Sequence, residues 1–258
     1  MLYICIPSYD EAPTVGVLLW RIRKVFQEYS REYEILVYDD ASDDGTRETL
    51  DAYAKVMPII IIDGHTRVGY ARAVDALLHK ASERTKYPRR DAVVLMQADF
   101  TDQPEHLPEL VKRFEGGADV VIGDRVLGPN APAAVRKLAK ITRWLPALWP
   151  IRRFVTVPGV KDPFGGLRLL RITVVRELLA GAGPGAGDRA VSDAPVCATS
   201  VGLLHHASRL ARRVEIVPLE SRWDIRTRES RVRPWPDALA LVRHGWATRS
   251  PRNSVAAA

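Results

Sequence analysis

Residues 2–45, LYICIPSYDEAPTVGVLLWRIRKVFQEYSREYEILVYDDASDDG, decide the fold class. The apolar run Leu2–Pro7 predicts a buried strand that ends at a proline. Thr14–Tyr29 carries apolar residues at helical spacing, and Glu34–Tyr38 is a second apolar run closed by an acidic, turn-forming cluster. The order strand, helix, strand predicts two parallel strands joined by a crossover helix.

The same alternation continues along the chain and predicts an α/β fold with a mostly parallel sheet flanked by helices. Further strands are expected at Pro58–Ile62, Ala92–Met96, Ala118–Ile122 and Val214–Pro218, and further helices at Thr46–Lys55, Gly69–Ala81, Leu107–Phe114 and Arg171–Leu179. Residues 128–160 are richer in Pro, Trp and Arg, which indicates a loop-and-helix excursion over the active face. We expect one domain over residues 1–233 and a C-terminal helix and frayed tail over 234–258.

The composition of the 258 residues, 47% apolar and 27% charged, is that of a globular protein with a real core. The two cysteines, Cys5 and Cys197, lie far apart and match no metal-ligand spacing, and Cys5 is expected to be a small buried side chain. No signal-peptide pattern and no window of about 18 apolar residues is present, so a cytoplasmic location is expected.

The net charge of +7 has two interpretations. Basic residues concentrate after Arg136 and from Arg209 to Arg252, which fits either a solvated surface or an anionic partner such as a phosphate or a membrane surface. Nucleic acid is not expected as a partner, because these stretches contain neither zinc-finger spacing nor a recognisable reader helix.

Polar clusters follow three of the expected strands. They are Pro7–Glu11, Asp39–Ser42 and Gln97–Asp99. Ligands bind at the carboxyl ends of the strands in an open parallel sheet, and carboxylates there can hold a nucleoside and a divalent cation. One such cluster could equally cap the following helix. Three clusters at separate strand ends favour a ligand site.

Several segments together resemble a known family. They are IPSYDEAPTV (6–15), ILVYDDASDDGT (35–46), VGYARAVDAL (68–77), VLMQADFTDQPEHLPEL (94–110), ADVVIGDRV (118–126), KDPFGGLRLLR (161–171) and, more loosely, RTRESRV (226–232). In this order and at these intervals the chain resembles the family 2 glycosyltransferases of the Rossmann-like GT-A fold. The most similar group within that family is the dolichol- and polyprenol-phosphate mannosyltransferases.

The resemblance implies a binding site for a nucleoside-diphosphate sugar, with GDP-mannose favoured and UDP-sugars open. Pro7, Tyr9 and Glu11 match the nucleoside-binding loop, in which Tyr9 would lie against the base. Asp39 would accept a hydrogen bond from the base or ribose, and Asp40 would support the turn.

The resemblance also implies a divalent cation, Mg²⁺ or Mn²⁺. Asp99 matches the last carboxylate of the family's Asp-x-Asp motif, which holds the ion against the diphosphate. The first Asp of that motif is Gln97 here, with Ala98 between them. An amide can coordinate a hard cation but adds no negative charge, and Asp102 could lend a compensating carboxylate.

Three further segments match parts of the family pattern near the diphosphate of the nucleotide sugar. Arg125 would face the sugar diphosphate, and the alternative is a surface ion pair with Asp124. Asp162 lies in the match to an Asp-Pro-x-x-Gly stretch before a helix, on which Arg168 is expected. Finally, Arg226, Ser230 and Arg231 resemble a segment that closes over the diphosphate, although Arg228 and Arg231 replace a Gly and a Lys of the family pattern.

The resemblance implies inversion at the anomeric carbon by direct displacement. A hydroxyl acceptor would need a general base, for which Asp193 is the best candidate, unless Asp193 only caps the next helix. A phosphate monoester, whose second pKa is ~6, needs no strong base.

A lipid phosphate would also explain why basic and apolar residues alternate in residues 136–153, since the chain could then bind peripherally at the inner face of the membrane. The basic members are Arg136, Lys137, Arg143, Arg152 and Arg153, and the apolar ones Trp144, Leu145, Leu148, Trp149 and Ile151. The alternative is an ordinary amphipathic helix that packs on the domain.

Two other functions stay open. One is a glycosyltransferase that uses a soluble hydroxyl acceptor, and the other is a non-catalytic protein that binds a nucleotide sugar. A dinucleotide-dependent oxidoreductase is not expected, because the first loop lacks the glycine fingerprint of such enzymes.

Overall fold

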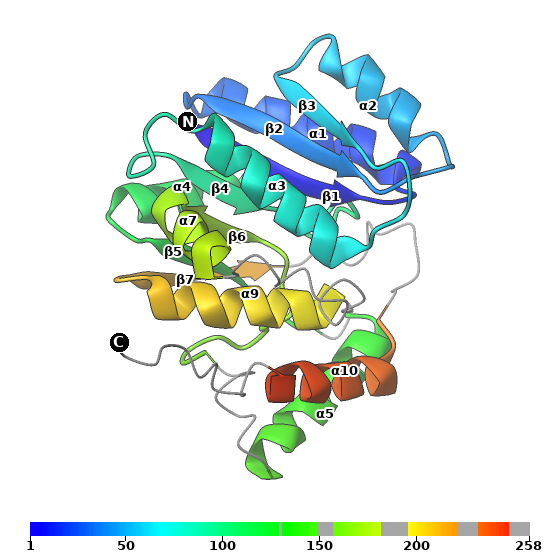
Figure 1. Ribbon diagram of the computed structural model, residues 1–258, viewed down its shortest axis with the longest axis vertical. Coiled ribbons are helices and arrows are strands. Elements are labelled where there is room, and N and C mark those ends of the chain that lie inside the picture. Colours follow the sequence, from blue (N-terminus) through cyan, green and yellow to red (C-terminus); the bar gives the residue numbers. More distant parts are fainter. Residues whose placement is uncertain (129–130, 149–156, 182–195, 221–231, 248–258) are drawn as a thin grey trace, which may run out of the picture.

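The computed structural model describes residues 1–128, 131–148, 157–181, 196–220 and 232–247. A seven-stranded sheet with the strand order β3-β2-β1-β4-β6-β5-β7 forms its centre (Figure 1). The strands are β1 (Leu2–Ser8), β2 (Tyr33–Asp39), β3 (Ile59–Asp63), β4 (Ala92–Leu95), β5 (Val120–Val126), β6 (Arg168–Arg171) and β7 (Val214–Glu220). The helices are α1 (Ala12–Glu28), α2 (Thr46–Ala54), α3 (Tyr70–Arg84), α4 (Leu107–Glu115), α5 (Ala133–Leu148), α7 (Ile172–Gly181), α9 (Val196–Leu210) and α10 (Pro234–Ala247), with a 3₁₀ turn at Pro104–His106.

The expected mostly parallel sheet is confirmed, with one strand reversed. β1, β2, β3 and β4 pair in parallel, as do β5 and β7, whereas β6 runs antiparallel to both β4 and β5. The prediction that Arg168 lies on a helix is wrong, because Arg168–Arg171 form β6. Leu169 and Leu170 point into the cores on opposite faces of the sheet, which is the period of a strand.

Two hydrophobic cores cover the two faces of the sheet. On one face, α1 and α4 pack against the side chains of Leu2, Ile4 and Ile6 of β1. On the other face, α3, α7 and α9 pack against Tyr3 and Cys5 of the same strand. The alternation along β1 therefore places one residue in two on each face, as a doubly covered sheet requires.

The helices differ from the expectation in one respect. The predicted helices all exist within a few residues of the expected bounds, and α5 lies inside the predicted excursion at 128–160. However, α9 was not predicted. Its buried face includes Ala198, Ser200 and Gly202, which are too small to give a clear apolar periodicity.

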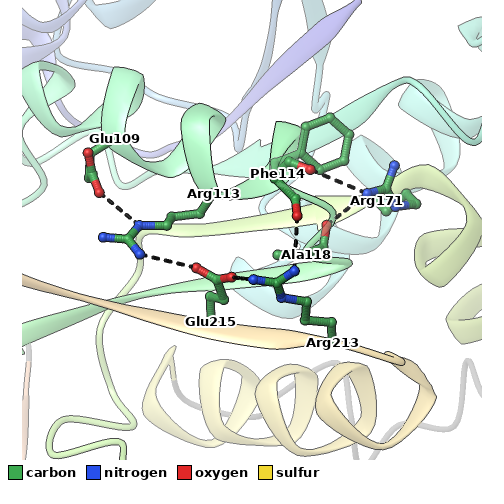
Figure 2. Close-up of polar contacts among 8 residues, drawn as sticks. Glu109, Arg113, Phe114, Ala118, Arg171, Arg213 and Glu215 are labelled. Atoms are coloured by element: carbon green, nitrogen blue, oxygen red, sulfur yellow. Dashed lines mark hydrogen bonds and ion pairs between the residues drawn. The ribbon is translucent and has the colours of Figure 1, made fainter.

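Arginines form ion pairs and hydrogen bonds at the end of the sheet where the parallel strands begin (Figure 2). Glu215 of β7 accepts from Arg113 and Arg213, and Arg113 also pairs with Glu109. Arg171 of β6 donates to the carbonyl of Phe114 in the last turn of α4 and to that of Ala118 just beyond it. Cations at a helix C-terminus satisfy its last carbonyls, so this edge is held together by paired groups.

Across the described residues, no helix is both long enough and apolar enough to cross a membrane.

Candidate active site

The candidate site lies where the strand order reverses. β1 has β2 on one side and β4 on the other, so the connections that leave β1 and β4 diverge to opposite sides. Ligands of open α/β sheets bind at such a switch point, outside the carboxyl ends of the strands. The three polar clusters follow β1, β2 and β4, and therefore lie at this edge as expected.

The three loops at this edge contain strained backbone. Asp10, Ala41 and Phe100 have φ values of 50°, 59° and 63°, and they are the non-glycine residues with positive φ in the described ranges. Each such residue costs about 1–3 kcal/mol, and residues of this kind cluster at functional sites. One lies in each loop, so the strain converges on one edge.

Two aspartates organise the loop after β2. Asp39 is 3% exposed, and its Oδ1 accepts from the backbone N and the hydroxyl of Ser42. The two carboxylate oxygens of Asp40 accept from the backbone N atoms of Val68 and Gly69, at 2.6 and 2.9 Å. Asp40 therefore fixes the entry to α3, while Asp39 has Oδ2 left to reach a ligand.

Helix capping does not explain these clusters. The N-cap residues of α1, α2 and α3 are Glu11, Gly45 and Gly69, and none of the three caps its helix with a side-chain hydrogen bond. The carboxylates of Asp39 and Asp40 instead hold neighbouring loops. The capping alternative is therefore wrong for these two residues.

The first loop brings Tyr9 and Glu11 to this edge. Glu11 is 6% exposed, its backbone N donates to the Thr46 hydroxyl, and its Oε2 accepts from the Thr14 hydroxyl. The guanidinium of Arg67 stacks on the Tyr9 ring, 3.9 Å from its centre. Arg67 therefore lies at this edge of the sheet beside Tyr9, although no sequence motif indicated it.

The loop after β4 folds back on itself. Asp99 Oδ1 accepts from the backbone N of Thr101, and Asp102 Oδ2 accepts from the backbone N of Gln97. Ala98 is 3% exposed and its side chain belongs to the core, so a ligand could meet only its backbone. Asp99 and Asp102 are both buried, at 7% and 3% exposure.

Gly166 allows two loops to approach each other closely. A Cβ atom at Gly166 would lie 2.7 Å from Asp102 Oδ2 and 2.8 Å from Gln97 Cγ. Both distances are shorter than real contacts allow, so only glycine fits here without a shift. The loop before β6 thereby packs directly against the Gln97–Asp102 loop.

Arg125 forms a buried ion pair, and its partner is Asp162. The Arg125 Nε donates to Asp162 Oδ2 at 2.8 Å, and the two side chains are 6% and 1% exposed. Asp124 instead accepts from the backbone N atoms of Lys161 and Asp162. The alternative of a surface ion pair between Arg125 and Asp124 is therefore wrong.

The pKa values at this edge show how the charges are coupled. Burial raises the pKa of Asp102 to about 6, opposed by the charge of Arg125 and reinforced by that of Asp99. Burial works to lower the pKa of Arg125, but Asp162, Asp102 and Asp99 together raise it. Arg125 thus offsets several buried carboxylates at once.

Arg168 and Tyr70 extend this cluster in a way that the sequence did not reveal. Arg168 is 2% exposed and its Nη2 donates to the Pro163 carbonyl. Burial lowers the pKa of Arg168 to about 10, which still leaves it charged at neutral pH. Burial also raises the pKa of Tyr70, whose hydroxyl bonds to Ser200 of α9 and interacts with Arg168. These residues connect α3, β6 and α9 beside the carboxylates.

The oxygen atoms in the loop after β4 suit a hard divalent cation that is also bound by a phosphate group. The described residues include no group of three or more His, Cys, Asp or Glu side chains placed to bind a metal ion. Asp99, Asp102 and Gln97 offer only oxygen donors, and Asp102 Oδ1 is a buried atom without a hydrogen-bond partner. Mg²⁺ is usually held by one or two carboxylates together with substrate phosphates, which matches this set.

Four predicted site residues lie outside the described residues. They are Asp193, Arg226, Ser230 and Arg231. The same holds for Trp149, Ile151, Arg152 and Arg153 of the basic and aromatic stretch.

A model of the family described as glycosyl transferase family 2 matches residues 3–179. This chain belongs to that family. It is a glycosyltransferase, and the resemblance of the sequence motifs is confirmed.

Named relatives and a solved structure agree with this membership. The chain is 28% identical to the undecaprenyl-phosphate mannosyltransferase of Micrococcus luteus over 215 residues, covering 83% of this chain and 80% of that one. It is 29% identical to the dolichol-phosphate mannosyltransferase of Pyrococcus furiosus over 186 residues, which covers 67% of this chain and only 46% of the relative. A mannosyltransferase from Pyrobaculum calidifontis, solved with GDP-Man and Mn²⁺, has a TM-score of 0.57 at 20% identity, over 99% of this chain and 65% of that one. This last similarity confirms the expected GT-A fold.

Proposed function

We propose that this glycosyltransferase moves a sugar, with mannose favoured, from a nucleoside-diphosphate sugar to a polyprenyl phosphate, with inversion at the anomeric carbon. The names of the two relatives support the acceptor class and the sugar. The complex of the structural neighbour with GDP-Man and Mn²⁺ supports GDP-mannose as donor and a divalent cation as cofactor. UDP-sugars remain the second donor class to test.

One observation carries the proposal. Four buried side-chain oxygens in the described residues have no hydrogen-bond partner, and three of them, Ser8 Oγ, Thr101 Oγ1 and Asp102 Oδ1, lie at the carboxyl ends of β1 and β4. A buried oxygen without a partner costs about 1–3 kcal/mol. Such groups are rare in folded proteins, so their concentration at the switch point indicates a ligand that satisfies them.

Different residues would bind different parts of the nucleotide sugar. Asp39 and the Tyr9–Arg67 pair would take the nucleoside, with Pro7 and Glu11 shaping the loop and Asp40 holding the loop that carries Arg67. Asp99 and Gln97, with Asp102 beside them, would hold Mg²⁺ or Mn²⁺. When bound, the ion offsets the negative charge of the departing diphosphate. Arg125, supported by Asp162, adds a fixed positive charge on the same side.

The chemistry is a single displacement. An oxygen of the acceptor phosphate forms a bond to the anomeric carbon as the bond from that carbon to the nucleoside diphosphate breaks, and the electron pair leaves with the diphosphate. The acceptor phosphate is already ionised near neutral pH, so this route needs no general base. Asp193 would serve as base only for a hydroxyl acceptor. Arg226, Ser230 and Arg231 would close over the diphosphate.

A donor screen tests the proposal. GDP-mannose, UDP-glucose and UDP-N-acetylglucosamine are each incubated with the protein and Mg²⁺ or Mn²⁺, with and without a polyprenyl phosphate, and nucleoside diphosphate release is measured. We expect release from GDP-mannose that depends on both the metal ion and the lipid phosphate. Release that depends on a soluble hydroxyl compound would show that the acceptor is such a compound and not a lipid phosphate. Binding of the nucleotide sugar without any transfer would indicate a non-catalytic protein.

Asp99→Ala should lower transfer about a thousandfold, since it removes the carboxylate that holds the ion where charge develops. The matched control is Asp75→Ala, because Asp75 is exposed on α3 and its ion-pair partner among the described residues is His79. The thermal midpoint of both variants should stay within a few degrees of the wild type. Turnover of Asp99→Ala at the wild-type rate would remove the metal assignment.

The relatives' lipid acceptors also suggest where the protein works. We place it in the cytoplasm, at the inner face of the membrane, where nucleotide sugars and the phosphate head of the lipid would meet.

A further inference from the structure

Two helices at the far end of the molecule carry a basic and apolar surface that the site does not use. In Figure 1, α5 and α10 lie together beyond α9, on the opposite side of the molecule from β3 and α2. α10 packs on both α5 and α9. We call the solvent-facing sides of α5 and α10 the α5–α10 face.

α10 exposes two large apolar side chains one turn apart. Trp235 is 65% exposed and Leu239 is 50% exposed, and residues four apart lie on the same side of a helix. The opposite side of α10 is buried through Ala238 and Leu241. α10 is therefore packed on one side and presents an apolar stripe to solvent on the other.

Around this stripe the charge has one sign. Arg233 and Arg243 are exposed on or beside α10, and Arg136, Lys137, Lys140 and Arg143 are exposed on α5. α5 contains no acidic residue. Asp237 of α10 is 8% exposed and accepts from the backbone N of Arg233. In the described parts of the two helices, six cations therefore reach solvent and no carboxylate does.

Several arginines elsewhere have acidic partners within the fold. Arg21 pairs with Glu105, Arg47 with Asp51 and Asp63, and Arg84 with Glu34. The six cations of the α5–α10 face form no ion pair with a described residue, and of the six only Arg233 interacts with a carboxylate of α10, that of Asp237. Most of their mutual repulsion is therefore not offset within the described residues. An anionic partner would offset it.

The α5–α10 face is connected to the candidate active site by Phe164. Phe164 belongs to the same hydrophobic cluster as Leu138 of α5, Leu241 of α10 and Val201 of α9. Its backbone N donates to Asp162, whose other oxygen accepts from Arg125. The two helices therefore rest on the loop that positions the buried ion pair of the site.

We propose that the α5–α10 face docks on an anionic lipid bilayer, with Trp235 and Leu239 inserted at the interface and the six cations against the headgroups. An exposed apolar stripe flanked by Lys and Arg is the pattern of helices that lie in a membrane surface. The inference rests on the proposed function only in that a lipid-borne acceptor gives the docking a purpose. Binding to vesicles can be measured without any sugar transfer.

The test is flotation of the full-length protein with vesicles of phosphatidylcholine alone or mixed with phosphatidylglycerol. We expect binding to the anionic vesicles only, weakened by salt because surface charges are screened. Trp235→Ser with Leu239→Ser should weaken binding at least about tenfold, as should Arg136→Gln with Lys140→Gln, since each basic residue near an anionic surface contributes about a fivefold factor.

The chain offers a matched control on α1. Val17 and Trp20 are 48% and 52% exposed there, so Val17→Ser with Trp20→Ser removes a similar apolar pair. Arg23→Gln with Lys24→Gln removes two exposed cations from the same helix. Both controls should bind vesicles as the wild type does, and every variant should keep the wild-type dissociation constant for nucleoside diphosphate.

Three results would overturn the proposal. The wild type could fail to float with anionic vesicles, the α1 variants could lose binding while the α10 variant keeps it, or the α10 substitutions could convert a dimer in solution into monomers. The last result would assign the α5–α10 face to a second copy of the chain. Vesicle binding without sugar transfer would support the docking surface and reject the proposed function.

Discussion

Asp91 and Asp102 lie at opposite ends of β4, one just before it and one in the loop that follows, and both are almost completely buried. Asp91 accepts from the amino group of Met1 and from the Thr85 hydroxyl, and its pKa is lowered because these partners outweigh burial. Asp102 has one oxygen without a partner, and burial raises its pKa to about 6. Both side chains have almost no exposed surface, but Asp102 lies deeper in the protein and has fewer hydrogen-bond donors than Asp91, so the two pKa values shift in opposite directions.

The same contrast extends across the sheet. At the edge where the parallel strands begin, Arg171, Arg213 and Arg113 hold the end of α4 and the start of β7 through ion pairs and carbonyls (Figure 2). At the other edge, buried oxygens lack partners and the backbone is strained at Asp10, Ala41 and Phe100. The first edge holds paired groups that stabilise the fold, and the second holds the unsatisfied groups that we propose a ligand would satisfy.

Arg171→Ala should have the largest effect on stability. Arg171 pairs with Asp119, donates to the Ala118 carbonyl and lies over the Phe114 ring at 4.3 Å. Its loss should lower the free energy of unfolding by about 2–4 kcal/mol, because several partners lose their donor together. Urea unfolding measures this, and kcat/KM of the folded protein should stay unchanged. Arg176→Ala, on the surface of α7, is the control and should cost less than about 0.5 kcal/mol.

Asp102 should make stability depend on pH in the direction opposite to that of an ordinary paired aspartate. Its folded pKa of about 6 lies above the unfolded value, so the bound proton stabilises the fold. This contribution is fully present below the unfolded pKa and is lost as the pH rises through about 6. Asp102→Asn cannot titrate, so its stability relative to the wild type should be higher at pH 8 than at pH 5 by about 1.4 kcal/mol, the value of one pKa unit. Denaturant unfolding in EDTA measures the difference.

Asp91→Asn is the matched control for that experiment. The pKa of Asp91 is lowered, so its contribution is present above the unfolded pKa and is lost only as the pH falls below that value. The stability gap between Asp91→Asn and the wild type should therefore be the same at pH 5 and pH 8. A gap for Asp102→Asn that is equally constant would contradict the contrast between the two ends of β4.

Gln97→Asp should have the smallest effect. A carboxylate at this position adds a charged oxygen beside Asp99 and Asp102, so Mn²⁺ in the presence of nucleoside diphosphate should bind about three- to tenfold more tightly. Electron paramagnetic resonance of Mn²⁺ gives the dissociation constant directly. Unchanged or weaker binding would show that the Gln97 side chain lies away from the ion.

The sequence predicted the elements better than their connections. Apolar runs such as Leu2–Pro7 and the acidic loops after them were sufficient to place β1, β2 and β4 and the polar clusters at their ends. β6 was missed because it has only four residues and its antiparallel direction depends on pairing with β4 and β5, which no local pattern encodes.

The sequence indicated which residues lie at the candidate site, but it did not indicate which residues they contact. Asp39, Asp99 and Arg125 lie at the expected edge, yet the pairing of Arg125 with Asp162 bridges residues far apart in the chain. Arg67 and Tyr70 reach the site through α3 and the loop before it, which Asp40 fixes through the backbone of Val68 and Gly69. Contacts of this kind follow from the fold, so motif spacing could not reveal them.

Calorimetric titration of nucleoside diphosphate, GDP or UDP, whichever binds more tightly, tests the central claim most directly. With Mn²⁺ present, we predict that Asp39→Ala and Asp99→Ala each weaken binding at least about tenfold, that only Asp99→Ala abolishes the tightening produced by Mn²⁺, and that Asp75→Ala changes neither. Equal dissociation constants for all four proteins, with and without Mn²⁺, would contradict a nucleotide site at the carboxyl edge of the sheet.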